Sequence, residues 1–314
     1  MLESQPVVVP PARAAVFLVV TVDAGGEGTV RDLLEDVSGL RRSVAFRAPA
    51  DELTGSAAWD RLFDGPRPRD LHPFVELAGE RHSAPSTPGE LLFHVRAHHM
   101  DLCFELARLI AERLTGAGTV VDEVYAFKYF DERDLLGYVD GSENPEGAAA
   151  ADAVFVGDED PGFRGGSYVI VQKYLHDLTA WHALPVEEQD RVIGRSKLAN
   201  VELPDDIKPA DSHVALNTVT DDNGDERKIV RENMPFGTVG EQEFGTYFIG
   251  YARTPDVTEQ MLRNMFLGNG PAAHDRILDY STAVTGCLFY VPTVTFLDDL
   301  PPAPGGEDTA TGPG

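Results

Sequence analysis

Strand-like and helix-like patterns follow one another along this chain in an order that restricts the possible folds more than any single motif does. Residues 14–22 form a continuous apolar, β-rich run, which is typical of a strand buried on both faces. From Val30 to Leu40, apolar residues recur at the spacing of one helix face. The other elements expected in this half are strands at Ser43–Arg47, near Phe74–Leu77, at Leu91–Arg96 and at Val120–Phe130, and a helix at Met100–Leu114.

The same order of elements recurs in the second half of the chain. A helix is expected over Asp177–Gly194, interrupted near Pro185, and the pair Asn223 and Gly224 favours a tight turn between two strands. The other elements expected here are strands at Ser167–Tyr174, His213–Thr220, Lys228–Glu232, Thr246–Ala252 and Leu288–Val291, a helix at Pro255–Phe266 and a helical segment around Asp275–Tyr280. Because β-α-β-β-α-β is the order of a ferredoxin-like unit, the sequence predicts an α+β fold of two such units in tandem.

The domain boundaries follow from this repeat and from two shifts in composition. We expect an N-terminal ferredoxin-like domain at 1–135 and a C-terminal one at 161–300. Residues 136–160, rich in Gly, Ala and acidic side chains, are interpreted as a linker, and residues 301–314 as a disordered tail. Either half of a 314-residue chain is long enough to bury a core without a metal or a disulfide.

The charge of the chain restricts its partners. It has 52 acidic against 26 basic residues, a formal net charge of −26 at pH 7, which repels nucleic-acid phosphates and anionic lipids. We therefore expect neither a nucleic-acid nor a membrane partner. The apolar run at 14–22 is too short to span a bilayer, and no basic segment or twin arginine precedes it. With two cysteines in apolar runs, Cys103 and Cys287, the sequence predicts a cytoplasmic protein.

Several common catalytic motifs are missing. The nine histidines show neither an HExxH motif nor a zinc spacing with cysteine, so the sequence does not indicate a zinc site. No glycine-rich segment forms a P-loop or a dinucleotide-binding fingerprint, and there is no GxSxG elbow. Nucleotide binding and serine-hydrolase chemistry therefore have no support.

Three local patterns remain. Gly137–Pro145 places Asp140 between glycines directly after an expected strand, where the backbone can come close to a bulky ligand. His213 is expected to open a strand, and Arg231 lies in a further polar segment. Taken singly, each residue has a more ordinary interpretation: a turn with a capping aspartate, a hydrogen-bonded core histidine and a surface ion pair.

Taken together, the segments resemble the dye-decolorising peroxidases, which are haem enzymes, and most closely their bacterial B-type subgroup. Gly137–Pro145 resembles the GxxDG signature of that family in its GxVDGxENP form. The other matching segments, in the same order along the chain, are Arg164–Tyr168, Gly194–Lys197, Ser212–Asn217 and Arg231–Gly237. The resemblance covers about the whole chain and implies a dimeric fold of the α+β-barrel type. It also implies a homo-oligomer, a dimer or larger, with haem b held mainly by the C-terminal half of each chain.

The resemblance also implies a role for each polar residue. His213 would be the proximal axial ligand of the haem iron, because ferric haem needs one strong nitrogen ligand. Asp140 would be the distal carboxylate that takes and returns a proton, with Asn233 orienting peroxide or a water. Arg231 would stabilise the charge that develops as the O–O bond breaks. We expect Arg231 to contribute more, because a carboxylate beside a guanidinium stays ionised and is a poor acid.

Further roles concern the surroundings of the haem. An acidic residue on the second ring nitrogen of His213 would fix its tautomer, and Asp275 or Asp279, one helical turn apart, could supply it; we prefer Asp275. The residues implied near the haem edge or its propionates are Arg195, Asn144, Gly165 and Gly166.

The function implied is a haem peroxidase that uses hydrogen peroxide to oxidise dyes, phenols or other one-electron donors through a ferryl intermediate. One alternative is a haem-binding or iron-release protein on the same fold, without fast turnover of peroxide. A second is a metal-free acidic scaffold or encapsulated cargo. The complete set of Asp140, Arg231 and Asn233 favours the peroxidase.

Overall fold

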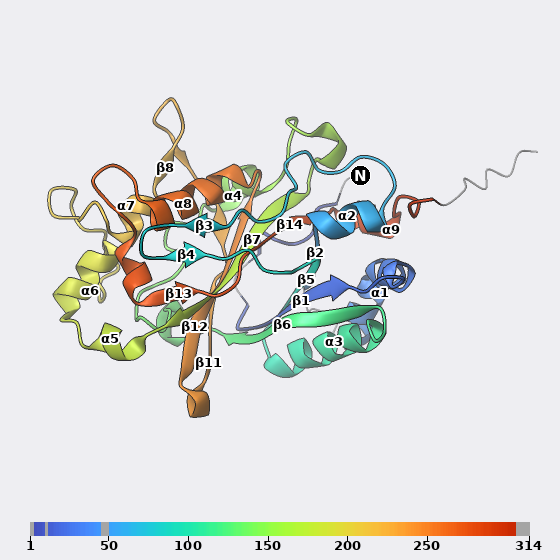
Figure 1. Cartoon of the computed structure of the whole chain (residues 1–314), viewed down its shortest axis with the longest axis horizontal. Helices are drawn as coiled ribbons and strands as arrows, with labels where there is room; N and C mark the ends of the chain where they lie inside the picture. Colours follow the sequence, from blue (N-terminus) through green and yellow to red (C-terminus); the bar gives the residue numbers. More distant parts are fainter. Residues whose placement is uncertain (1–2, 10–11, 45–49, 306–314) are drawn as a thin grey trace, which may run out of the picture.

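An antiparallel sheet of ten strands organises the chain in the computed structural model, which describes residues 3–9, 12–44 and 50–305 (Figure 1). The first six main elements form one βαββαβ unit. When its four strands are numbered along the chain, their order across the sheet is fourth, first, third, second. These elements are β1 (Ala14–Val22), α1 (Glu27–Val44), β2 (Ala50–Gly55), β5 (Leu91–Ala97), α3 (Met100–Arg113) and β6 (Gly118–Phe127). Between β2 and β5 lie α2 (Ser56–Leu62) and the paired strands β3 (Leu77–Ala78) and β4 (Ser83–Ala84).

The second half repeats this strand order. Its four main strands lie in the order β14, β7, β12, β11, which is again fourth, first, third, second. The elements of this unit are β7 (Ser167–His176), α5 (Leu178–His182), α6 (Val186–Ile193), α7 (His213–Asn217), β11 (Met234–Thr238), β12 (Glu243–Ala252), α8 (Asp256–Leu267) and β14 (Cys287–Val291). The predicted α+β class and the tandem of two ferredoxin-like units are therefore confirmed.

Shorter elements complete the chain. They are the helices α4 (Gly147–Val154) and α9 (Val294–Asp298), the strands β8 (Val219–Thr220), β9 (Glu226–Arg227), β10 (Val230–Arg231) and β13 (Ser281–Ala283), and the 3₁₀ turns η1 (Phe130–Glu132), η2 (Pro161–Phe163), η3 (Val239–Glu241) and η4 (Arg276–Asp279). The strands β8 and β9 pair across the acidic turn that contains Asn223 and Gly224, so the position of the predicted turn is confirmed. Its second strand is β9 rather than the strand expected at Lys228–Glu232.

The two units share one sheet that closes on itself. The neighbours run from β12 through β11, β6, β1, β5, β2, β14 and β7, and β7 pairs again with β12. The two units meet where Phe236 of β11 pairs with Ala126 of β6, and where β2 pairs with β14. An eight-stranded barrel results, in which each unit supplies four strands.

The residues of β1 separate two hydrophobic cores. Ala15, Phe17 and Val19 belong to the cluster inside the barrel, whereas Val16 and Leu18 belong to a cluster beneath the outer helices. This arrangement follows from the alternation of side chains along a strand and explains why nearly every residue of the run at 14–22 is apolar. In Figure 1, α1 and α3 pack side by side on one end of the sheet, and α7 and α8 cover the other end.

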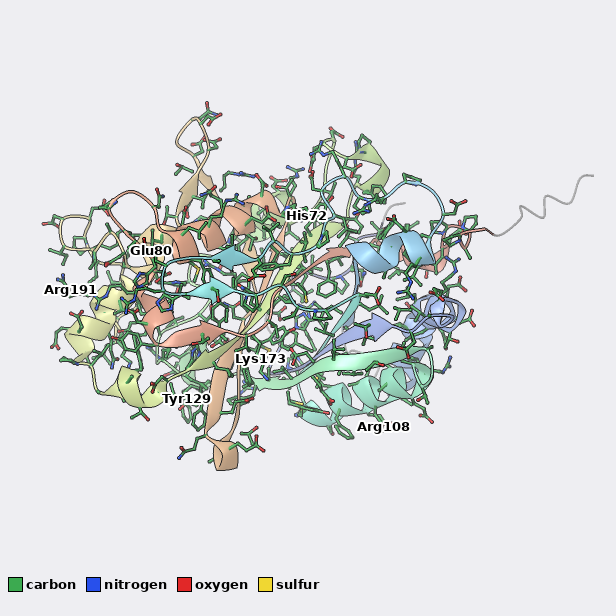
Figure 2. The ribbon with its side chains drawn as sticks, viewed as in Figure 1. His72, Glu80, Arg108, Tyr129, Lys173 and Arg191 are labelled. Atoms are coloured by element: carbon green, nitrogen blue, oxygen red, sulfur yellow. The ribbon has the colours of Figure 1, made fainter. Side chains whose placement is uncertain are left out.

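Charged side chains occupy the periphery. Arg108 on α3 and Arg191 on α6 lie on opposite outer edges of the molecule (Figure 2), and Arg108 pairs with Glu105 and Glu112 on its own helix. Among the described helices, none combines the length and the apolar character that crossing a bilayer requires.

Several short elements differ from the sequence expectations. The strand expected at His213–Thr220 is wrong in its first part, where the chain forms α7 before the two-residue β8. Helix α7 is only five residues long, which is too short for a helical period to be visible in the sequence. The Asn217 side chain stabilises the helix by donating a hydrogen bond to the carbonyl of His213 at 2.8 Å. The segment interpreted as a linker contains α4, whose residues Ala150 and Val154 are buried.

Other differences concern the ends of elements. The strand expected at Ser43–Arg47 begins in the last residues of α1, and its remaining residues lie outside the described ranges. Strand β3 has two residues rather than the longer edge strand expected near Phe74–Leu77. The start of the predicted tail is anchored, because the carbonyls of Pro301 and Pro302 accept hydrogen bonds from Arg31 and from the amide of Asp64. Residues 306–314 of that tail lie outside the described part of the chain.

Candidate active site

A cavity of about 320 Å³ lies in the C-terminal unit, between α7, α8, β7, β10, β12 and the segment 134–143. Apolar side chains form much of its wall: Ile193, Val214, Ile229, Phe248, Met261, Leu262, Met265 and Ile277. The sequence-predicted residues that line it are Asp140, Arg195, His213, Arg231 and Asn233. Five predicted residues from four separate segments of the sequence are thus brought together around one space.

His213 is the first residue of α7, and a carboxylate holds its ring. Its Nδ1 donates to Oδ2 of Asp275 at 2.7 Å, and its side chain is 30% exposed, on the cavity wall. Asn217, one turn further along α7, also donates to this carboxylate oxygen, at 3.4 Å. Since Nδ1 carries the proton in this arrangement, Nε2 presents a lone pair that can bind a metal.

Burial and backbone hydrogen bonds hold Asp275 in place. It is fully buried and caps the 3₁₀ turn η4, where its Oδ1 accepts from the amide of Ile277 at 3.0 Å. Its own amide donates to the carbonyl of Met265 at 2.8 Å, which joins η4 to α8. Asp279, the other carboxylate considered for this role, instead accepts hydrogen bonds from His82 and His274. The two carboxylates diverge because a 3₁₀ turn does not superpose residues four apart as an α-helix does.

A second polar group on the cavity wall consists of Asp140 and Asn233. The amide Nδ2 of Asn233 donates to Oδ1 of Asp140 at 3.2 Å, and Oδ1 of Asn233 accepts from the amide of Ile249 at 3.1 Å. This second bond fixes which side of the Asn233 amide faces Asp140. Within the described ranges, no ion pair joins Asp140 to Arg231. The expected contact between that carboxylate and guanidinium is therefore replaced by one to an amide.

Arg231 lies on β10 and is positioned through its backbone. The side chain of Asn144 accepts from the Arg231 amide at 2.9 Å and donates to the Arg231 carbonyl at 2.6 Å. Asn144 was expected at the haem edge, but it does not line the cavity and acts as this two-way clamp instead. The Nε of Arg231 is buried and has no hydrogen-bond partner among the described residues. A buried guanidinium nitrogen without a partner is costly, so its donor is available to a bound molecule.

The residue between Arg231 and Asn233 faces the opposite way. Because side chains alternate along an extended segment, Arg231 and Asn233 line the cavity while Glu232 enters the barrel interior. There Glu232 forms an ion pair with Arg96 of β5, and both side chains are almost completely buried. The N-terminal unit thus helps to hold the segment that carries the two polar residues of the cavity.

Arg195 lines the rim of the cavity. Its Nη1 lies 2.7 Å from Oε1 of Glu143, and its Nη2 donates to the carbonyl of Asn200 at 2.9 Å. Lys228 approaches the other oxygen of Glu143 at 3.3 Å. The rim therefore holds two cations that share one carboxylate, an arrangement in which a ligand carboxylate can replace Glu143.

Gly165 and Gly166 do not lie on the cavity wall, contrary to expectation. Their amides donate to the carbonyls of Val156 and Phe163, so these donors are already used. Gly165 has φ +82°, and a Cβ at Gly166 would collide with the hydroxyl of Tyr290. The glycines are needed to bring the chain into β7, away from the cavity.

Two titratable groups of the wall were not expected from the sequence. His176 bonds through its two ring nitrogens to Ser281 at 2.7 Å and to Thr246 at 2.9 Å, and burial lowers its pKa to about 4. Burial raises the pKa of Asp134 to about 7, and the nearby charge of Asp140 adds to this shift. The signal for His176 is its place two residues after Tyr174, which puts both on one face of β7, but only the folded sheet shows which face that is.

These features suit a haem better than they suit a polar metabolite. The cavity offers an imidazole nitrogen for an axial bond, apolar side chains for a porphyrin face, and cations at the rim for anionic substituents. The buried Nε of Arg231, with Asp140 and Asn233, would serve a small polar molecule beside the iron. The class that the fold and the cavity define is a haem-dependent oxidoreductase.

Comparison with known proteins gives the family. The chain matches the N-terminal Dyp-type peroxidase family over residues 4–128 and the C-terminal one over residues 131–296. A dye-decolorizing peroxidase of Mycolicibacterium paratuberculosis is 62% identical over 316 residues, which cover 99% of this chain and 89% of the relative. That of Mycobacterium tuberculosis is 61% identical over 305 residues, covering 96% and 91%. The chain belongs to the Dyp-type peroxidase family, and it is a peroxidase.

Solved structures of similar proteins support the same family assignment. The encapsulated DyP-type peroxidase from Mycobacterium smegmatis superposes with a TM-score of 0.95 at 60% identity, covering 97% of this chain and all of the other. DyPB from Rhodococcus jostii RHA1 superposes with a TM-score of 0.92 at 55% identity, covering 94% and 97%. Variants of the Rhodococcus protein have been solved in complex with haem, and one other variant with manganese.

Proposed function

We propose that this chain binds haem b through His213 and uses hydrogen peroxide to oxidise dyes, phenols or other small one-electron donors. The observation that carries the proposal is the bond from Nδ1 of His213 to the buried carboxylate of Asp275, which leaves Nε2 toward an apolar cavity. A carboxylate on the second ring nitrogen makes the imidazole a stronger ligand. A haem of the b type is favoured because the two cysteines, Cys103 and Cys287, form no CxxCH attachment motif.

Asp140 and Asn233 are proposed to handle the proton of peroxide. The bound haem iron supplies the site at which peroxide is reduced. Asp140 takes the proton from one peroxide oxygen and returns it to the oxygen that leaves as water, directly or through one water. Asn233 holds the carboxylate of Asp140 at 3.2 Å and so fixes its direction. The acid–base role depends on this orientation rather than on an ion pair.

Arg231 is proposed to stabilise charge. A guanidinium does not lose its proton at any working pH, so it contributes a fixed positive charge and hydrogen-bond donors. The Asn144 clamp holds its backbone, and its Nε has no partner in the described part of the protein. Since no carboxylate of the described residues pairs with Arg231, its charge is available to peroxide as the O–O bond breaks.

Arg195 is proposed to bind a haem propionate. Its guanidinium already accommodates a carboxylate, that of Glu143, at 2.7 Å. A propionate offers the same bidentate acceptor. The proposal further includes a homo-oligomer and a cytoplasmic location, which sedimentation analysis and cell fractionation test.

Haem titration tests the proposal. We expect the protein to take up one haem per chain, with a Soret absorption band, and His213→Ala to lose this binding because the axial nitrogen is removed. His182→Ala, which changes an exposed histidine of α5, is the matched control and keeps wild-type haem affinity. Wild-type haem affinity in His213→Ala would contradict the assignment. Haem uptake without any reaction with peroxide would favour the haem-binding or iron-release alternative.

A further inference from the structure

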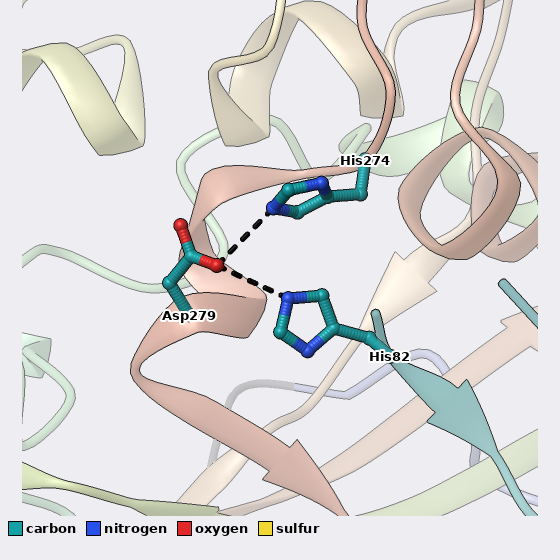
Figure 3. Close-up of side chains that lie close together, drawn as sticks. All are labelled: His82, His274 and Asp279. Carbon is teal, nitrogen blue, oxygen red and sulfur yellow. Dashed lines mark hydrogen bonds and ion pairs between the residues drawn. The ribbon is translucent and has the colours of Figure 1, made fainter. Parts of the chain in front are cut away.

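A cluster of potential metal ligands lies outside the cavity just described. His82 follows β3 in the turn to β4, His274 lies between α8 and η4, and Asp279 is the last residue of η4. None of the three lines the cavity. Figure 3 shows both imidazole rings directed at the same carboxylate. No zinc spacing marks these residues in the sequence, because His82 is far from the other two along the chain.

The distances within the cluster suit a common ion. Nε2 of His82 lies 3.1 Å, and Nε2 of His274 3.2 Å, from the same oxygen, Oδ1 of Asp279. Ligand atoms bound to one tetrahedral Zn²⁺ at about 2.0–2.2 Å lie roughly 3.3–3.5 Å apart. The three ligand atoms lie within 4.8 Å of one another, so small side-chain rotations can bring both nitrogens and the oxygen onto one ion.

We propose that His82, His274 and Asp279 bind one divalent transition-metal ion of the zinc type. Two imidazoles and one carboxylate form a common zinc ligand set, and imidazole favours zinc, copper and nickel over magnesium and calcium. The side chains are 20%, 13% and 26% exposed, respectively, so an ion can enter and keep water as a fourth ligand. A metal would replace the hydrogen bonds that now join the two rings to Asp279.

The charges around the cluster are mixed. Arg81 lies 3.7 Å from Oδ1 of Asp279 and opposes a cation, but its side chain is 66% exposed and can turn toward solvent. Glu80, labelled in Figure 2, is an exposed acid in the same turn. The net charge of −26 raises the concentration of divalent cations around the whole protein.

The position of the cluster gives a bound ion a structural effect. His82 belongs to the N-terminal unit, whereas His274 and Asp279 belong to the C-terminal unit, so the ion would cross-link the two. His274 directly precedes Asp275, the residue that holds Nδ1 of His213. Metal binding would therefore stabilise η4, and we expect zinc to raise the melting temperature by several degrees at saturating concentration.

Calorimetric titration of the full chain with zinc chloride, after EDTA treatment and desalting at pH 7.5, tests the proposal. We expect one zinc ion per chain and at least a tenfold loss of affinity in His82→Gln, His274→Gln and Asp279→Asn. His72→Gln is the matched control, because His72 is another half-exposed histidine near an acid, 3.3 Å from Glu259. Arg81→Gln is expected to bind zinc a few-fold more tightly, since it removes the opposing charge.

Two results would overturn the proposal: no stoichiometric zinc uptake by the wild type, or unchanged affinity in His82→Gln. His82→Gln is decisive because it lies on a separate turn and leaves the Asp275 segment intact. Equal competition by magnesium would also overturn it, since that would indicate attraction by net charge alone. The titration needs neither peroxide nor turnover, so its outcome is independent of the proposed peroxidase mechanism.

Discussion

The carboxylate of Asp275 determines how the His213 imidazole can act. Full burial and a hydrogen bond from the amide of Ile277 hold this carboxylate in place, and the 2.7 Å bond selects the tautomer with a free Nε2. An axial ligand depends on such a partner for its orientation and its basicity. The contact links a residue of α7 to the residue that caps η4, 62 positions further along the chain.

Asp275→Asn tests this dependence. We expect haem affinity to fall about 10- to 100-fold, because an amide accepts more weakly from Nδ1 and no longer fixes the tautomer. Asp298→Asn is the matched control: it changes an exposed carboxylate of α9, outside the segment that carries Asp275. Equal haem affinity in both variants, measured by haem titration, would show that the Asp275 contact has no such role.

Burial of the His176 imidazole is expected to make the free energy of unfolding depend on pH. Its pKa is lowered to about 4 by burial, against about 6.5 in the unfolded chain. Between these values the unfolded chain binds a proton that the folded protein does not, so stability falls as pH falls from about 6.5 toward 4. The loss from this group is at most about 1.4 kcal/mol per pH unit.

Urea unfolding at pH 7.5 and pH 5 checks the prediction. We expect His176→Gln to lose less stability between these two values than the wild type does. His98→Gln, at an exposed position, should lose as much as the wild type. The prediction fails if His176→Gln and the wild type respond identically to pH.

The sequence predicted polar residues that the fold brings to one cavity, but it did not predict their contacts. Four of these residues lie in short sequence motifs that can be recognised without the structure. They are His213, Asp140, Arg231 and Asn233, and all four line the cavity. The clamp that Asn144 forms joins two residues 87 positions apart, and no local pattern encodes such a pairing.

At the scale of elements, β10 is a strand of two residues that depends on its neighbours for its position. It pairs with β12 through Val230 and Arg231, and the side chain of Asn144 completes the hydrogen bonding of the Arg231 backbone. A short strand has few hydrogen bonds of its own, so each external contact matters for the direction of its side chains.

Asn144→Ala is expected to loosen β10. It removes two hydrogen bonds and leaves the amide and carbonyl of Arg231 without these partners, a loss of about 1–3 kcal/mol in unfolding free energy. The reaction of the haem-loaded protein with peroxide should slow, because the guanidinium is less well placed, while haem affinity is preserved. Asn223→Ala, in the exposed β8–β9 turn, is the control. Wild-type stability and rate in Asn144→Ala would refute the positioning role.

Long elements could be predicted from periodicity, whereas short ones could not. Strand β1 and helices α1 and α3 carry regular apolar patterns over nine or more residues, and the structure confirms them. Helix α7 and strands β11 and β13 have three to five residues each, too few for a period to show. Their conformation is decided by contacts with other segments.

At the scale of the whole molecule, the closed sheet makes the two units depend on each other. Strand β2 needs β14 on its outer edge, β6 needs β11, and the buried pair of Arg96 and Glu232 joins the units inside the barrel. The start of the C-terminal tail also binds back, through Pro301, to Arg31 of α1. Neither unit has all of its edges covered by its own strands.

We therefore expect the full chain to unfold in a single transition, and a fragment of residues 1–135 to aggregate or to melt without cooperativity. Calorimetry and circular dichroism of both proteins check this. Two separate transitions in the full chain, or a stable and monomeric fragment, would show that the units fold independently.

The reaction with hydrogen peroxide tests most directly the claim that His213 on one side, and Asp140, Arg231 and Asn233 on the other, serve one haem. One equivalent of peroxide is mixed with haem-loaded protein in a stopped-flow spectrometer. The wild type and Arg227→Leu, a change in an exposed ion pair with Asp256, should both show a rapid shift of the Soret band. Arg231→Leu should retain haem and react at least about 100-fold more slowly. A reaction as fast in Arg231→Leu as in the wild type would contradict this account.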